Sequence, residues 1–243
     1  ERLAQDNLDA LFISNTENRR YISGFESSAG YLLVTRHNAV ICTDFRYIEQ
    51  ASQQAPGWRV DRIGGKPDWL ANLVKELEIK VLGFEADDVT VETLDRFRKN
   101  LKQNDANPTL KPTSSICVEL RAYKDDVELP LLQRAIDIGD QAFEETVDQL
   151  EVGMSEKEAA WIFEKAVRER GAESISFPTI VAIGPNAARP HHATGDTTMV
   201  EGQTIVFDCG AKYKGYCSDL TRTVVLGKAN GKVKRIYDIV LTA

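Results

Sequence analysis

The stretch GQTIVFDCGAKYKGYCSDLTRTVVLG, residues 202–227, decides how the second half of this sequence folds. Two β-prone runs, residues 204–209 and 218–226, flank a short polar segment with Gly210 and Gly215 at its edges. Apolar and β-branched runs separated by a short glycine-bounded segment are typical of a β-hairpin. The sequence therefore predicts an antiparallel ribbon here.

Each run of this hairpin contains one aspartate, Asp208 or Asp219. A turn at Tyr213 and Lys214 would place the two aspartates directly opposite each other, with Cβ atoms roughly 4.5–5.5 Å apart on one face. Like charges repel there, and the apolar residues 205–207 suggest a strand covered on both faces. We predict a buried acid pair compensated by one divalent cation, or by two about 3.5–4 Å apart. The alternative is a strand cap and a solvated edge.

The composition is that of an ordinary globular protein with a core, since 42% of residues are hydrophobic and 28% are charged. The net charge of −7 argues against nucleic acid as a partner. Four cysteines without C-x-x-C spacing indicate free thiols. No apolar run approaches the roughly 20 residues that span a bilayer, and no leader opens the chain, so we expect no membrane contact and a cytoplasmic location. Glu1 in place of methionine suggests a trimmed chain.

Short apolar runs alternate with helical patterns in the first half of the chain, which predicts an α/β layer domain at residues 1–115. His37 falls in a predicted hairpin turn at the surface. The domain joint is expected at residues 104–115, where prolines and polar residues break the periodicity. The predicted strands are residues 8–14, 31–35, 39–43 and 81–84, and the predicted helices are residues 44–51, 69–78 and 91–101.

The second predicted domain, residues 116–243, places two helices over an antiparallel sheet, an α+β arrangement. The first helix covers residues 131–150, and Ser155 with Glu158 forms a capping-box pattern ahead of the second. A strand at residues 176–183 and the hairpin follow. A last helical pattern begins at residue 234 and stops without a helix-ending signal, so we expect the natural protein to continue.

A loop between the predicted strand and the hairpin holds two of the three histidines, His191 and His192, within FPTIVAIGPNAARPHHATGD, residues 177–196. Adjacent histidines are often part of a solvated turn. Beside an acid pair in the same domain, they are candidates for a metal ligand, a proton carrier or a hydrogen-bond donor to substrate.

The spacing of Asn186, His191, Asp208 and Asp219, the last within D-L-T-R-T, resembles the pita-bread metallopeptidases. The branch is that of the Xaa-Pro peptidases, aminopeptidase P and prolidase. The stretches NTENRRYISGFESSAGYLLV and TDFRYIEQA resemble the creatinase-type amino-terminal domain of that branch, and LRAYKDDVELPLLQRA resembles its domain junction. The resemblance covers nearly the whole chain and implies an α/β creatinase-type domain followed by a truncated α+β pita-bread catalytic domain.

The resemblance also implies roles for individual residues. Asp208 and Asp219 match the first two metal-binding acids of the family, and Thr221 matches a threonine that lines the site. His191 matches the catalytic histidine that contacts substrate near the scissile bond, and His192 is the weaker candidate for substrate binding. The implied cofactors are two divalent ions, Mn²⁺ or alternatively Co²⁺ or Zn²⁺, which activate water and polarise the carbonyl of an Xaa-Pro bond. The implied substrates are peptides with proline at the second position.

The sequence departs from the family pattern after Asp219. Family members supply a further histidine and two glutamates downstream, whereas residues 220–243 contain neither residue type. We therefore expect the amino-terminal part of an Xaa-Pro peptidase, inactive by itself, with weak or no metal binding. Two alternatives stay open: a metal-free pita-bread binding or scaffold module, and a creatinase-like hydrolase. Relatives of the first domain mediate dimerisation, so a homodimer is expected. Aminopeptidase and dipeptidase activities are not distinguished.

Overall fold

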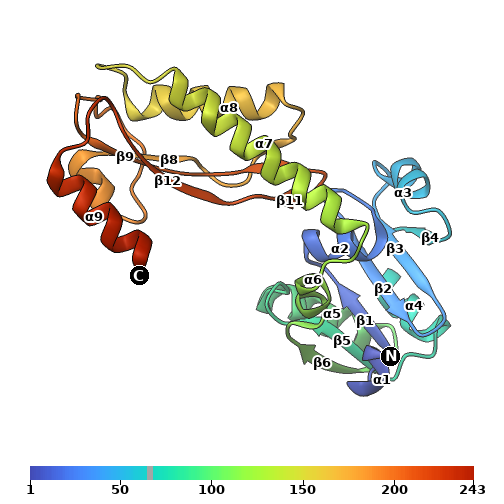
Figure 1. The fold of residues 1–243 in the computed structure, drawn as a ribbon. Helices are drawn as coiled ribbons and strands as arrows, with labels where there is room; N and C mark the ends of the chain where they lie inside the picture. The colour runs from blue at the N-terminus through green and yellow to red at the C-terminus, as the bar shows by residue number, and fades with distance from the viewer. Residues whose placement is uncertain (65–67) are drawn as a thin grey trace. The chain divides into compact units, whose positions relative to one another are not determined.

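The computed structural model describes residues 1–64 and 68–243, which form two compact units, Glu1–Tyr123 and Lys124–Ala243. The first unit is α/β and the second is α+β, so the predicted fold classes are confirmed (Figure 1). Within the described residues, none of the helices combines the length and the apolar character needed to cross a membrane.

A six-stranded mixed sheet in the order β4-β3-β2-β1-β5-β6 forms the centre of the first unit. β2 lies antiparallel between β1 and β3, whereas the β3–β4, β1–β5 and β5–β6 pairs are parallel. The strands are β1 (Ala10–Ile13), β2 (Tyr31–Thr35), β3 (Ala39–Thr43), β4 (Arg59–Arg62), β5 (Val81–Glu85) and β6 (Thr109–Thr113). The helices are α1 (Arg2–Gln5), α2 (Thr16–Ser23), α3 (Ile48–Gln54), α4 (Trp69–Glu76), α5 (Val91–Gln103) and α6 (Ile116–Ala122).

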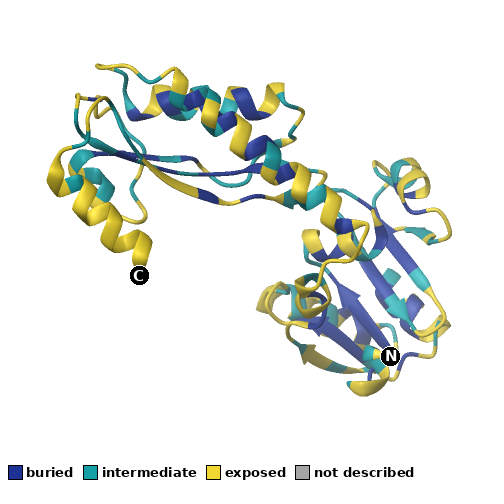
Figure 2. Ribbon diagram, in the orientation of Figure 1, coloured by how far each residue is buried: buried dark blue, intermediate teal, exposed yellow. Residues whose placement is uncertain are grey.

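Strand β1 is buried on both faces and joins two hydrophobic cores (Figure 2). Phe12 points into a core with α4 and α5, where its ring lies 4.9 Å from that of Tyr31 and 5.2 Å from that of Phe97. Leu11 and Ile13 point the other way, into a core that includes residues of α3 and α6. Because successive strand residues alternate between faces, one apolar strand requires helices on both sides of the sheet.

Several elements of the first unit were not predicted: α1, α2, α6, β4 and β6. Helix α2 has clear caps, because Asn15 Oδ1 accepts the Asn18 N–H at 3.0 Å and Gly24 ends the helix with a φ of 76°. The predicted helix start at Asp44 is wrong. Asp44 lies in the turn before α3 and its carboxylate pairs with Arg46 instead.

The segment predicted as a domain joint, residues 104–115, contains strand β6, which pairs with β5 along its whole length. Pro112 is compatible with this strand because β6 lies at the edge of the sheet, where one side needs no N–H donor. This segment therefore belongs to the sheet of the first unit. The hairpin of β2 and β3 is confirmed, with His37 exposed in its turn.

The second unit places helices α7 and α8 on one face of the three-stranded antiparallel sheet β12-β9-β8 (Figure 1). A second small sheet has the order β11-β10-β7. The helices are α7 (Glu128–Asp148), α8 (Glu156–Glu169), the 3₁₀ turn η1 (Gly184–Ala188) and α9 (Gly231–Thr242). The strands are β7 (Ser174–Ile175), β8 (Ile180–Ile183), β9 (Thr204–Cys209), β10 (Ala211–Tyr213), β11 (Tyr216–Cys217) and β12 (Leu220–Val225).

The core of the second unit lies between the two helices and the sheet, with Ile138, Phe163 and Phe207 fully buried. The capping box of Ser155 and Glu158 is confirmed: Ser155 Oγ accepts the Glu158 N–H at 3.2 Å, and Glu158 Oε2 accepts the Ser155 N–H at 2.8 Å. It fixes the start of α8, the helix whose first residue is Glu156.

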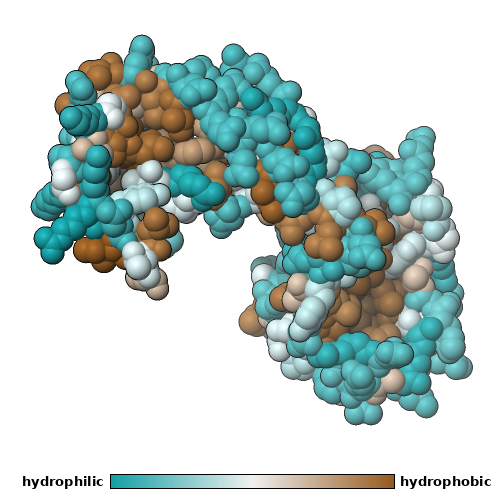
Figure 3. Space-filling model, viewed as in Figure 1, coloured by the Kyte–Doolittle hydropathy of each residue, from teal (hydrophilic) through white to brown (hydrophobic). Residues whose placement is uncertain are grey.

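Two predictions for the second unit need correction. Of the strand predicted at residues 176–183, only residues 180–183 form a strand, β8; β7 precedes the predicted range, and Phe177 and Pro178 lie in the irregular segment between the two strands, where proline cannot donate to a ladder. The predicted last helix is present as α9, which starts at Gly231 and exposes Ile239, Val240 and Leu241. The space-filling view shows hydrophobic residues at this helix, whereas hydrophilic residues cover much of the outer surface of α7 (Figure 3).

Candidate functional site

The two predicted metal ligands lie on the ribbon of β9 and β12, but in a different register from the predicted one. Asp208 pairs with Thr221, and the same register continues at the other end of the ribbon, where Tyr213 pairs with Tyr216. The prediction that Asp208 faces Asp219 directly is therefore wrong. The turn lies one residue further along than predicted, at Lys214 and Gly215, whose φ angles of 45° and 79° are both positive, as a two-residue type I′ turn requires.

The two aspartates nevertheless lie on the same face of the ribbon. The observed pairing is displaced by two residues, and an even displacement leaves each side chain on its original face. Continued from both sides, the observed register places Asp219 opposite Gly210, diagonal to Asp208. Thr221 lies on this face as well and donates its hydroxyl to Asp208 Oδ1 at 3.2 Å.

This face is open rather than buried, which overturns the prediction of a buried acid pair. Strand β9 alternates between Ile205, Phe207 and Cys209 in the core and half-buried residues on the other side, including Asp208. Asp219 is exposed. The apolar run before Asp208 thus belongs to a strand with one covered face, because α7 and α8 lie on the core side only.

The open face offers oxygen ligands suited to a hard divalent cation. Within the described ranges, 1–64 and 68–243, no three or more His, Cys, Asp or Glu side chains lie close enough together to hold a metal ion. Catalytic zinc sites, for comparison, use three protein ligands. Asp208 and Asp219 therefore fit as part of a divalent-metal site and do not form a complete one.

The backbone beside Asp219 is tightly fixed where the two sheets meet. A Cβ atom at Gly210 would lie only 1.9 Å from the carbonyl oxygen of Ser218, so only glycine fits there. The same carbonyl accepts the Ser176 hydroxyl at 2.7 Å. On the α7 side, a Cβ atom at Gly139 would lie 2.9 Å from Ser218 Oγ. Close packing around Ser218 therefore fixes the backbone position from which the Asp219 side chain projects.

The histidine loop leaves the end of β8 and returns along the outer edge of that strand. Thr194 Oγ1 accepts the Val181 N–H at 2.9 Å and donates to the Thr179 carbonyl at 2.9 Å. On its other edge, β8 pairs with β9, where Ile180 lies opposite Asp208. The loop thus runs beside the strand next to the one that carries Asp208.

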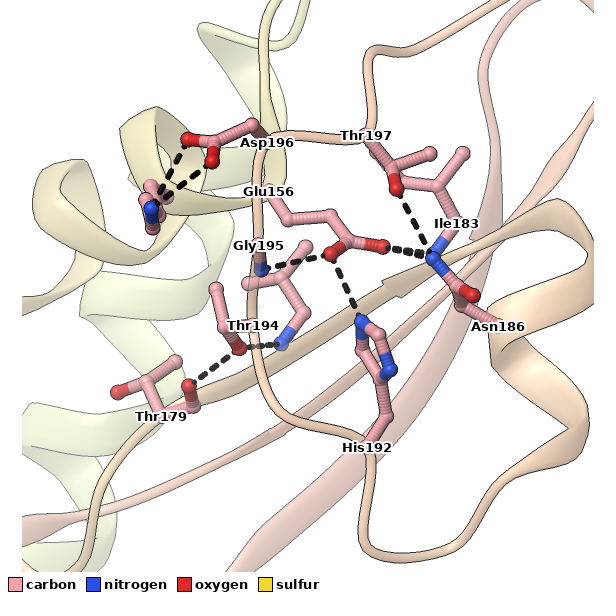
Figure 4. Close-up of polar contacts among 11 residues, drawn as sticks. Glu156, Thr179, Ile183, Asn186, His192, Thr194, Gly195, Asp196 and Thr197 are labelled. Atoms are coloured by element: carbon pink, nitrogen blue, oxygen red, sulfur yellow. Dashed lines mark hydrogen bonds and ion pairs between the residues drawn. The ribbon is translucent and has the colours of Figure 1, made fainter.

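The two histidines of this loop have different surroundings. His191 is exposed, whereas the His192 side chain is 9% exposed and its Nε2 lies 2.8 Å from Glu156 Oε2 (Figure 4). Across the described part of the chain, no hydrogen bond or ion pair links either histidine to Asp208 or Asp219. The His191 side chain is therefore accessible to solvent, whereas the His192 side chain faces inward.

Glu156, the first residue of α8, is the centre of this network and is fully buried. Its Oε1 accepts the Ile183 N–H at 3.0 Å and the Asn186 side-chain amide at 2.9 Å. Its Oε2 accepts the Gly195 N–H at 2.8 Å and contacts His192 (Figure 4). One carboxylate therefore joins a helix start, a strand end and both limbs of the histidine loop.

The pKa of Glu156 is the balance of two opposing influences. Burial is the largest and raises the pKa, but the hydrogen bonds from His192, Asn186 and the two backbone N–H groups together lower it below its usual value. The positive end of the α8 dipole also favours a negative charge at the first helical position. Glu156 is therefore held as a carboxylate inside the protein.

Our sequence analysis missed Glu156, although a signal was present. Glu156 shares one face of α8 with Ala159, Phe163, Ala166 and Val167, all of which are buried. A glutamate on the apolar stripe of an amphipathic helix is unusual, because a buried charge must be compensated by partners. The partners are two backbone amides and two loop side chains, which the sequence pattern could not place.

The fold and the incomplete metal site of Asp208 and Asp219 define a class of protein: a creatinase-type α/β domain joined to a metallopeptidase-type α+β domain. Residues 1–123 match the family model of the creatinase/prolidase N-terminal domain, and residues 130–243 match that of metallopeptidase family M24. The chain therefore belongs to the M24 metallopeptidases of the Xaa-Pro peptidase type.

The individual proteins that this chain resembles are consistent with the family assignment. A Xaa-Pro dipeptidase of Pyrococcus horikoshii is 31% identical over 100% of this chain and 67% of its own length. The solved structure of a Xaa-Pro dipeptidase from Bacillus anthracis is 38% identical, with a TM-score of 0.93 over 98% of this chain and 66% of that one. For the X-Pro aminopeptidase of Thermotoga maritima, the corresponding values are 34%, 0.89, 100% and 70%. The chain thus spans about two thirds of the length of these relatives.

Proposed function

We propose that this chain is part of a metal-dependent peptidase that cleaves Xaa-Pro bonds. The observation that carries the proposal is the pair Asp208 and Asp219 on one open face of the ribbon, with the Thr221 hydroxyl bonded to Asp208, in a chain of the M24 family. Divalent cations held by such carboxylates would supply Lewis-acid polarisation of the scissile carbonyl. We propose Mn²⁺, with Co²⁺ or Zn²⁺ as alternatives.

His191 is the residue that we propose to contact the substrate near the scissile bond. It is exposed, follows Pro190 at the tip of the loop, and has a neighbour, His192, that is tied to Glu156. An imidazole can donate a hydrogen bond or carry a proton near neutral pH. A prolyl amide has no N–H group, so the substrate must be recognised through its carbonyl and ring shape.

The metal ligands that this chain lacks are proposed to come from the remaining third of the length of its relatives. This follows from two observations together: the described residues contain no complete metal-ligand group, and the relatives extend beyond the matched region. We accordingly propose that residues 1–243 do not hydrolyse peptides by themselves. We further propose a cytoplasmic homodimer; the four free cysteines fit a reducing compartment.

The test compares Mn²⁺ binding and Xaa-Pro hydrolysis by the intact protein and three variants. Asp208→Asn and Asp219→Asn should each abolish turnover of Xaa-Pro substrates and weaken Mn²⁺ binding in calorimetry. Asp148→Asn, an exposed aspartate at the end of α7, is the matched control and should retain both. The proposal fails if Asp208→Asn and Asp219→Asn keep wild-type turnover. Turnover by residues 1–243 at the rate of the intact protein would refute the claim that this segment is inactive.

A further inference from the structure

Glu156 lies away from the proposed metal face, yet it is bonded to the loop that carries His191. Backbone bonds hold the return limb of the loop: the Glu156 N–H donates to Thr197 O at 3.0 Å and the Lys157 N–H to Gly195 O at 3.1 Å. The loop tip, residues 189–193, has no such support. Among the residues that the structure describes, the contact of His192 with Glu156 is the one polar tie from this tip to an element outside the loop.

Both carboxylate oxygens of Glu156 accept a backbone N–H group, which the amide of a glutamine cannot do. The Ile183 N–H approaches one carboxylate oxygen and the Gly195 N–H approaches the other. A backbone N–H can only donate, whereas an Asn amide can flip and an imidazole can change tautomer. If glutamine replaced Glu156, its NH₂ group would face one of these two backbone donors in either orientation.

We propose that Glu156 is a positioning residue that holds the tip of the histidine loop in the conformation in which His191 meets the substrate. The inference rests on the proposed function, since it takes His191 as the substrate contact. His192 and His191 are adjacent in sequence, so the bond that fixes the His192 ring also fixes the backbone from which His191 projects. Asn186, at the other limb of the loop, is bound to the same carboxylate and to Thr197 Oγ1 at 3.0 Å.

The first test measures amide hydrogen exchange across residues 185–198 and needs no activity. Glu156→Gln should accelerate exchange in this loop by about tenfold or more, while β9 and the later turns of α8 keep their protection. Glu169→Gln is the matched control, because it removes an exposed carboxylate at the far end of the same helix without touching the loop or the capping box. If Glu156→Gln fails to fold, His192→Ala removes only the tie to the tip and should loosen residues 189–193 alone.

The second test uses the intact protein with an Xaa-Pro substrate. Glu156→Gln should lower kcat/KM by about tenfold or more while the Kd for Mn²⁺ stays at the wild-type value. The Kd should not change because Asp208 and Asp219 are not among the hydrogen-bond partners of the Glu156 side chain. A purely structural role would weaken both together. Unchanged loop exchange in folded Glu156→Gln, or a loosened loop with unchanged kcat/KM, overturns the inference. If wild-type protein shows no Xaa-Pro hydrolysis, the proposed function fails, and the exchange data alone then decide whether Glu156 holds the loop.

Discussion

Replacing Gly210 by alanine should disrupt the ribbon that carries the two aspartates. The new Cβ atom would lie 1.9 Å from the Ser218 carbonyl oxygen, which is a backbone atom and cannot rotate away. Moving that carbonyl would break its hydrogen bond from Ser176 Oγ at 2.7 Å and strain the bond from the Ala211 N–H to Ser218 Oγ at 3.0 Å. Overpacking contributes about 1–3 kcal/mol and each hydrogen bond that is lost about 1 kcal/mol; with one bond lost and the other weakened or lost, the destabilisation is roughly 2–5 kcal/mol.

The assay for this change is amide hydrogen exchange in β9 and β12, which reports on the ribbon and not on the first unit. Since about 1.4 kcal/mol corresponds to a factor of ten, amide protection in β9 and β12 should fall roughly 30-fold to 3,000-fold in Gly210→Ala. Gly231→Ala is the control: a Cβ atom there meets nothing within 4 Å, and alanine favours the start of α9. Equal protection in Gly210→Ala and wild type would refute the steric argument.

Three further predictions concern pH, thiol reactivity and helix capping. Because the pKa of Glu156 is lowered in the folded state, the Glu156 carboxylate stabilises the fold fully above its unfolded pKa of about 4.3, and this stabilisation is lost as the pH falls through the folded pKa. Urea titrations of wild type and Glu156→Gln should differ in unfolding free energy by on the order of 2–4 kcal/mol at pH 7. This difference should narrow below about pH 4. A thiol reagent should label exposed Cys217 quickly and spare Cys209, where burial, reinforced by the neighbouring Asp208 and Asp219 charges, raises the pKa to about 12; rapid labelling of Cys209 would contradict the structure. Ser155→Ala should destabilise the second unit by about 1 kcal/mol, measured by urea unfolding, and an unchanged midpoint would count against the capping box.

Features set by local patterns could be read from the sequence. The hairpin of β2 and β3 and the capping box of α8 follow from residues close in the chain, and the structure confirms them. The elements that were not predicted have different physical causes. Strand β6 has a weak local pattern and is stabilised by pairing with β5, so its sequence alone predicts a joint. Helix α2 was missed although its Asn15 and Gly24 caps are both local, because its polar residues hide the apolar periodicity.

The burial of the aspartates could not be judged from the strand that carries them. Ile205, Val206 and Phe207 form an unbroken apolar run, yet Val206 points to the open face with Asp208. Whether one or both faces of a strand are covered depends on elements that pack against it, and here α7 and α8 cover only one. The partners of Glu156 were equally out of reach, because they come from β8 and two limbs of a loop about 30 to 40 residues away.

The sequence contains a signal for the observed register of the ribbon. The predicted register is wrong by two residues, but it places Asp208 and Asp219 on the same face as the observed one does. A two-residue turn needs positive φ at both central positions, and glycine adopts this readily in the second. Reading Gly215 as that residue would have placed the turn at Lys214 and Gly215 and given the observed pairs. Side chains alternate along a strand with a period of two, so an error of two residues keeps Asp208 and Asp219 on one face, whereas an error of one residue would have separated them. The candidate metal site therefore requires that Asp208 and Asp219 lie on one face of the ribbon, and it does not require that they lie directly opposite each other.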